Sequence, residues 1–145
     1  KFSFEPRAGI GFKINAAQSV SLAYGLHSRL EPIGYYLARQ THANGTTQPN
    51  KNLGLTKSHH LVLGYELALG TSSRLRTEAY FQRLFHVPVI PGTSFSMSNL
   101  EMDWFFNDSL ANEGTGTNTG IQITLEKFLD KGFYYLGSLS LFNSS

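Results

Sequence analysis

The stretch LVLGYELALGTSSRLRTEAYFQ, residues 61–82, decides the fold of this chain. Large residues alternate with smaller or polar ones in its first half: Leu61, Leu63, Tyr65, Leu67 and Leu69. The same period of two continues over residues 74–82. Successive side chains of a β-strand point to opposite faces, so this period predicts strands with one apolar face. Residues 70–73, between the two halves, favour a tight turn, and the whole stretch therefore predicts a β-hairpin.

Similar alternation recurs along the rest of the chain. It predicts further strands over residues 8–14, 19–29, 119–128 and 133–141. Short turn segments at 15–18, 70–73 and 130–132 join the strands in pairs, whereas long polar stretches at 37–54 and 84–116 separate the pairs. Structureless connections of that length are uncommon in compact soluble domains. We expect an all-β fold of about six antiparallel, up-and-down strands, with both long loops at one end.

The composition argues against several classes of protein. The chain has 145 residues, of which 15% are charged and 13% aromatic, and its formal net charge is +2. No apolar run approaches the ~20 residues of a transmembrane helix, and the scattered charges do not predict a nucleic-acid groove. The sequence holds no Cys and no HExxH, GxSxG or P-loop spacing. We expect neither an enzyme nor a cofactor, and no nucleic-acid partner.

Short turns that alternate with long loops are typical of outer-membrane β-barrels, whose extracellular loops are the long ones. The residue types opposite the apolar positions fit a barrel lumen, because they are mostly Ser, Gly, Ala, Gln, Arg and Glu. Aromatic residues lie near the predicted turns, as in an interfacial girdle: Phe12, Phe128, Phe133, Tyr134 and Tyr135. Six strands are too few to surround a lumen. We therefore expect residues 1–145 to be one segment of a longer transmembrane barrel.

Several phrases of the sequence, taken together, resemble a known family. They are EPR at 5–7, SLAYGLHS at 21–28, KSHHLVLGY at 57–65, RTEAYFQ at 76–82, VPV at 87–89, NEGTG at 112–116 and GIQITLEKF at 120–128. Their order and spacing resemble the barrel portion of TonB-dependent outer-membrane receptors of the Bacteroidota type, which often carry a carboxypeptidase-regulatory-like domain. The resemblance implies a barrel of about 22 strands around a plug domain, in the outer membrane of a Gram-negative bacterium.

The same resemblance implies a function in ligand binding and energised nutrient uptake, without bond chemistry. The implied partners are outer-membrane lipid, the protein's own plug domain and TonB, the last two through parts outside this sequence. The transported ligand stays unidentified, because the plug and many other loops would contact it.

Five acidic or basic residues fall on the predicted lumen-facing side: Glu66, Arg74, Arg76, Glu78 and Glu126. Contact with a plug or a solute is one explanation for these charges. The explanation we favour is a ladder of ion pairs between neighbouring strands, for example Glu66 with Arg76.

The longer loop carries a candidate ligand-contact group. Trp104 and Phe105 lie there beside Asp103 and Asp108, and this combination of residues can stack against a sugar or another flat ligand. Such a cluster more often folds a loop on itself.

His59 and His60 invite a metal hypothesis. Adjacent strand residues point to opposite faces, so the two histidines cannot easily share an ion, and we expect no metal site.

Two alternatives remain open at this point. One is a soluble all-β binding module, such as a carbohydrate-binding sandwich that uses Trp104. The other is a small complete barrel, which requires two more strands within residues 84–116. Dependence on detergent separates the membrane hypotheses from the soluble one, since only a membrane wall exposes residues such as Leu61 and Leu63.

Overall fold

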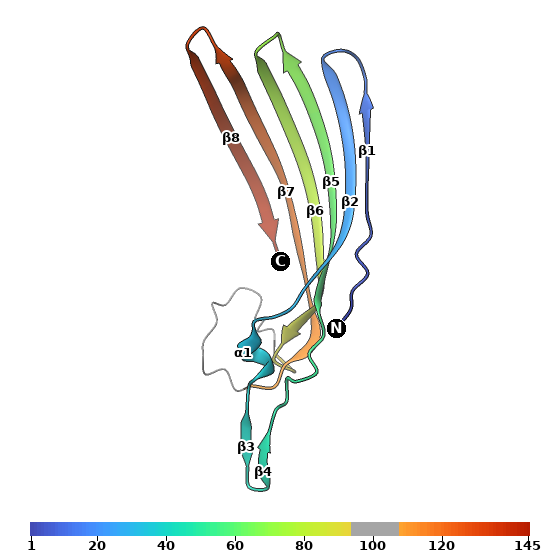
Figure 1. Cartoon of the computed structure of the whole chain (residues 1–145), viewed down its shortest axis with the longest axis vertical. Coiled ribbons are helices and arrows are strands. Elements are labelled where there is room, and N and C mark those ends of the chain that lie inside the picture. Colours follow the sequence, from blue (N-terminus) through green and yellow to red (C-terminus); the bar gives the residue numbers. More distant parts are fainter. Residues whose placement is uncertain (94–107) are drawn as a thin grey trace. The chain divides into compact units, whose positions relative to one another are not determined.

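The computed structural model describes residues 1–93 and 108–145, and within them the chain is all-β. Six strands form one antiparallel sheet in the order β1-β2-β5-β6-β7-β8 (Figure 1). Their bounds are β1 (Arg7–Lys13), β2 (Gln18–Arg29), β5 (Thr56–Leu69), β6 (Ser73–Val89), β7 (Ala111–Asp130) and β8 (Phe133–Ser144). The predicted all-β class with antiparallel strands is confirmed.

The connection between β2 and β5 holds the remaining elements. The helix α1 (Ile33–Tyr36) comes first, and a two-stranded sheet of β3 (Gln40–His42) and β4 (Gly45–Thr47) follows it. None of the helical structure in the described ranges is long and apolar enough to cross a membrane.

Each strand range expected from the alternation coincides, to within one residue, with part of a strand of the large sheet. Strands that follow one another along this sheet are neighbours in space, which is an up-and-down arrangement. In the described residues the sheet is open, with β1 and β8 at its edges, and is not closed into a barrel.

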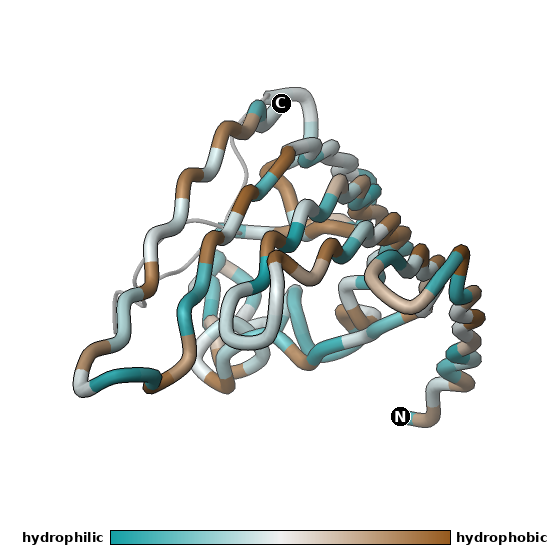
Figure 2. The backbone as a smooth tube through the Cα atoms, turned by 90° about the horizontal axis from the view of Figure 1, so that it is seen from above, coloured by the Kyte–Doolittle hydropathy of each residue, from teal (hydrophilic) through white to brown (hydrophobic). Residues whose placement is uncertain are grey.

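The strand register gathers large apolar side chains on one face of the sheet. In the β1–β2 hairpin, Ile10 lies opposite Leu22 and Phe12 opposite Val20. In the β7–β8 hairpin, Ile121 lies opposite Leu141 and Ile123 opposite Leu139. Figure 2 shows hydrophobic and hydrophilic residues alternating along the backbone. We call the side that carries these residues, together with Leu61 and Leu63 of β5, the apolar face, and the opposite side the polar face.

The two long connections are shorter and more structured than their composition suggests. Strand β6 continues to Val89 and β7 begins at Ala111, so both ends of the expected 84–116 loop are strand. Gly114 explains the error, because a Cβ at this position would lie 2.6 Å from Cγ1 of Val89. A glycine that the composition assigns to a loop is therefore a point of close strand approach. The expected 37–54 loop likewise contains the β3–β4 hairpin.

The described chain divides into two compact units. Unit 1 comprises residues 1–5, 27–58 and 83–116, and unit 2 comprises residues 6–26, 59–82 and 117–145. Unit 1 contains both long connections and has a small core of Tyr35, Leu53 and Leu110, with Tyr36 and Ile90 packed against it. Unit 2 contains the three short turns.

Unit 2 lacks a hydrophobic core of the usual kind. The buried hydrophobic residues of the described chain all belong to unit 1: Tyr35, Ala38, Leu53, Val87 and Leu110. In unit 2 the buried positions are two glycines, Gly25 and Gly64. Many large apolar residues of the sheet in unit 2 are therefore exposed and not packed in a core.

Candidate functional site

The polar face of unit 2 carries a ladder of ion pairs centred on Arg74. Its Nη2 lies 2.6 Å from Oε2 of Glu126, and its Nη1 lies 3.6 Å from Oε2 of Glu66. Arg76 pairs along its own strand, with Nη2 2.7 Å from Oε1 of Glu78. The suggested pair of Glu66 with Arg76 is therefore wrong: Arg74 pairs with carboxylates on both neighbouring strands, while the guanidinium of Arg76 is paired with Glu78. All five predicted lumen-facing charged residues take part in ion pairs.

A chain of hydrogen bonds crosses the same face from β5 to β8. Nε2 of Gln82 lies 2.8 Å from Nε2 of His60, and Oε1 of Gln82 accepts a hydrogen bond from Nδ2 of Asn118 at 2.8 Å. Asn118 Oδ1 in turn accepts from the Ser144 hydroxyl at 2.6 Å. Side chains on this face thus satisfy one another across four strands.

His59 and His60 point to opposite faces, as the sequence predicts. The Tyr24 hydroxyl lies 2.8 Å from Nδ1 of His59, and the two rings are stacked with centroids 6.0 Å apart. His60 instead contacts Gln82 on the polar face. Among the described residues, no group of three or more His, Cys, Asp or Glu side chains is arranged to hold a metal ion.

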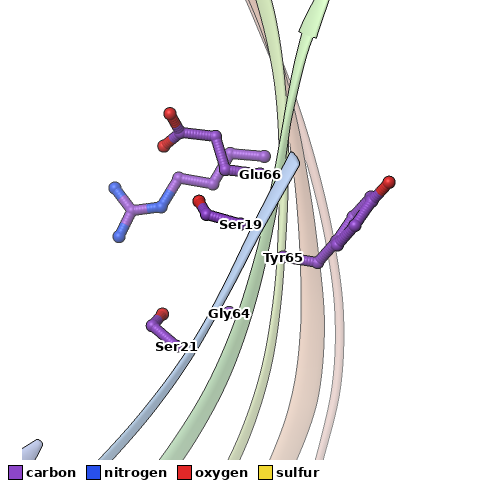
Figure 3. A pocket seen from close by; sticks show the side chains of 6 residues that line it. Ser19, Ser21, Gly64, Tyr65 and Glu66 are labelled. Carbon is purple, nitrogen blue, oxygen red and sulfur yellow. The ribbon is translucent and has the colours of Figure 1, made fainter. Parts of the chain in front are cut away.

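A shallow hollow lies on the polar face where β2 and β5 carry small residues. The residues that line it are Ser19, Ser21, Gly64, Tyr65, Glu66 and Arg76. A Cβ added to Gly64 would come within 2.6 Å of the Ser21 hydroxyl oxygen. Figure 3 shows Ser19, Ser21 and Glu66 on one side of the strands and Tyr65 on the other. The hollow therefore belongs to the polar face alone.

The apolar face differs sharply from the inner face of a soluble sheet. Its side chains are substantially exposed, including Leu22 at 43%, Leu63 at 50%, Leu139 at 59% and Leu141 at 63%. In an ordinary antiparallel sheet with one solvated face, the apolar face is packed on a core. Here the described residues of unit 2 provide no such layer.

The candidate ligand-contact loop is only partly described. Asp103, Trp104 and Phe105 lie outside the described residues. Asp108 is exposed, and its backbone carbonyl accepts a hydrogen bond from Nδ2 of Asn50 at 2.9 Å. Asp108 is thus joined to Asn50 within unit 1.

Asn50 is a structural residue that the sequence analysis missed. It is completely buried, and besides its bond to Asp108 its Oδ1 accepts from the Leu110 backbone N–H at 2.8 Å. The Asn50 side chain therefore bonds to two residues that follow it in the sequence by 58 and 60 positions. Its setting in a polar stretch, residues 48–52, held no signal of burial.

Glu31 and Thr56 form a second buried contact in unit 1. The Thr56 hydroxyl donates to the Glu31 carboxylate, which also lies 3.7 Å from Nη2 of Arg29. Thr56 also contacts the backbone carbonyl of His86, and Nδ2 of Asn112 donates to that carbonyl at 2.8 Å. These contacts join β5, β6 and β7 in unit 1.

Tyr35 lies in the core of unit 1. Burial raises the pKa of its phenol, and the negative charge of Glu31 raises that pKa further.

Comparisons with protein-family models, with curated proteins and with solved structures find no match to this chain.

Proposed function

We propose that unit 2 is part of the wall of a transmembrane β-barrel in the outer membrane of a Gram-negative bacterium. The observation that carries this proposal is the exposed apolar face, opposite a polar face whose side chains pair with one another. Barrel strands in a membrane alternate between a lipid-facing apolar side and a polar inner side. Lipid then takes the place of the missing core.

The cost of leaving this face in water supports the proposal. Its exposed large residues are Ile10, Phe12, Leu22, Tyr24, Leu61, Leu63, Leu69, Phe81, Ile121, Ile123, Tyr135, Leu139 and Leu141. Full burial of one such side chain is worth about 1.5–3 kcal/mol, so half-exposure of the whole set forgoes on the order of 10 kcal/mol. That loss equals the total stability of an ordinary domain. A hydrocarbon environment removes it.

The length of the apolar stretch also matches a bilayer. On β5 the apolar residues extend from Leu61 to Leu69, and His59 precedes them on the same face. A tilted strand crosses the hydrocarbon layer in about 9–11 residues. The stretch of β5 within unit 2 is therefore long enough to cross, with His59 and Tyr24 at one boundary.

We further propose that the wall belongs to a TonB-dependent receptor that binds a ligand and imports it. The sequence phrases of this family, the alternation of short turns with long connections and the paired charges of the polar face support this assignment. In such a receptor, the polar face of β5, β6 and β7 lies toward the plug domain, and the connections of unit 1 lie on the ligand side. TonB acts through other parts of the protein.

The test uses the natural polypeptide that contains this sequence, in native outer-membrane vesicles. The membranes are photolabelled with a lipid-soluble carbene reagent, and labelled residues are located by peptide mass spectrometry. We expect label at Leu63, Leu139 and Leu141 and little at their polar-face neighbours Gly64, Ser138 and Ser140. Recovery of the polypeptide in the water-soluble fraction contradicts the proposal and favours a soluble all-β binding module.

A further inference from the structure

The turn end of the apolar face carries an isolated cation. Lys127 lies directly opposite Tyr135 in the β7–β8 register, in line with Ile121 and Ile123 on the apolar face. No carboxylate of the described residues forms an ion pair with it, and its ammonium instead contacts an aromatic ring. The nearby Asp130 instead accepts a hydrogen bond from Ser72. A positively charged side chain on an otherwise apolar face suggests that an anionic group outside the described residues binds there.

Two aromatic residues of β8 lie beside this cation, Phe133 and Tyr135. The ammonium of Lys127 lies 4.6 Å from the centre of the Phe133 ring, and Phe133 and Tyr135 are themselves 55% and 43% exposed. Tyr and Trp rings favour the headgroup level of a membrane, and a Lys side chain can lay its apolar stem along a surface while its charge reaches polar groups. The group thus combines a positive charge with an apolar floor.

We propose that Lys127, Phe133 and Tyr135 form a binding site for the phosphate of an anionic membrane phospholipid, whose charge no cation within the same headgroup neutralises. The proposal rests on the proposed membrane function. The ammonium binds the headgroup phosphate, and the two rings lie beside the glycerol and the first acyl carbons. Charge complementarity favours a phosphate, and continuity with the apolar face favours a lipid over a free anion.

A simpler explanation is that Lys127 only covers the Phe133 ring and stabilises the turn. Under that explanation, its charge has no influence on which lipid the protein prefers. The two explanations therefore differ in a measurable lipid preference, and not only in stability.

The experiment reconstitutes the natural polypeptide into vesicles of phosphatidylcholine alone or of phosphatidylcholine with phosphatidylglycerol. The quantity measured is the ratio of protein incorporated into the anionic and the neutral vesicles. We expect Lys127→Gln to lower this ratio about fivefold, the effect of one basic residue at an anionic surface, and Lys127→Arg to preserve it. The matched control is Lys13→Gln, which removes the same charge from the paired position opposite Ser19, on the polar face.

The outcomes separate this inference from the proposed function. If wild-type protein incorporates into neither vesicle, the membrane function itself is wrong. If it incorporates but Lys127→Gln leaves the ratio unchanged, or lowers it no more than Lys13→Gln does, the phosphate site is wrong and the membrane function stands. A second measurement is the acetylation of Lys127. If inorganic phosphate alone protects Lys127 from acetylation as well as phosphatidylglycerol vesicles do, the assignment to a phospholipid is wrong.

Discussion

His86 lies in β6 with a backbone φ of 56°, in the left-handed region that most side chains avoid. Its carbonyl is held from both sides, by the Thr56 hydroxyl and by Nδ2 of Asn112. Residues with unfavourable backbone angles persist where surrounding contacts determine them, and His tolerates this region better than β-branched residues do. Local conformation here follows from neighbours on the two adjacent strands.

Replacement of His86 tests this strain. We expect His86→Val to lower the free energy of unfolding by about 1–3 kcal/mol, because a β-branched residue is strongly disfavoured at positive φ, and His86→Gly to be nearly neutral. The measurement is denaturant unfolding in detergent. His42→Val serves as control, since His42 is an exposed residue of β3. Equal loss at both positions argues against strain at His86.

Asn50 offers a second test at the residue scale. Asn50→Ala leaves the Leu110 N–H without its acceptor and the Asp108 carbonyl without its donor. The Leu110 N–H is buried, and an unsatisfied buried group costs about 1–3 kcal/mol, so we expect a loss of that order in unfolding free energy and faster hydrogen exchange at Leu110. Asn52→Ala, at an exposed position two residues away, should change neither quantity. Unchanged exchange at Leu110 in Asn50→Ala would show that this bond is unimportant.

The strand is the scale at which the two faces of unit 2 acquire different roles. Side chains on the polar face form pairs between strands, such as Arg74 with Glu126. These pairs are partly exposed, so each contributes little to the free energy of unfolding in water. They account for the polar character of this face. The apolar residues of the same strands lack such partners among the described residues of unit 2.

Substitution by arginine on the two faces tests this difference. Leu63→Arg places a cation in the middle of the apolar face, and we expect it to reduce membrane insertion, because this substitution costs about 2–4 kcal/mol at the bilayer midplane. Ser140→Arg, on the polar face opposite Gln122, should insert normally. The assay is protection from protease after folding into vesicles. Similar protection of both variants contradicts the facing of the strands.

At the scale of the whole molecule, the open edges of the sheet are decisive. Strand β8 (Phe133–Ser144) has no charged residue and no proline, the features that commonly block pairing at an edge. Within a membrane every backbone polar group needs a partner, so an open edge cannot face lipid. The proposed wall therefore requires further strands beside β1 and β8.

The intact mass of the natural polypeptide measures this requirement. We expect a detergent-dependent protein several times heavier than the 16.1 kDa of this chain, because we expect the same polypeptide to supply the further strands of the proposed wall. The measurement is mass spectrometry of the outer-membrane fraction. A water-soluble product near 16.1 kDa would contradict both the barrel segment and the lipid-facing role of β5.

The strands, their antiparallel order and the division of residues such as Leu63 and Glu66 between two faces could all be predicted from the amino-acid sequence. These features are local, since a period of two and a tight turn at residues 70–73 are contained within a few residues. The same locality explains why His59 and His60 were correctly assigned to opposite sides.

The contacts between distant segments, by contrast, could not be predicted and are known from the three-dimensional structure. The choice of Arg74 as the partner of Glu66, the burial of Asn50 and the extension of β7 past Gly114 all depend on which side chains meet after the strands pair. Arg74 and Glu126 are 52 residues apart, and Asn50 and Leu110 are 60 apart. No periodic pattern in the chain records such a pairing, because it is fixed by reach and packing in three dimensions.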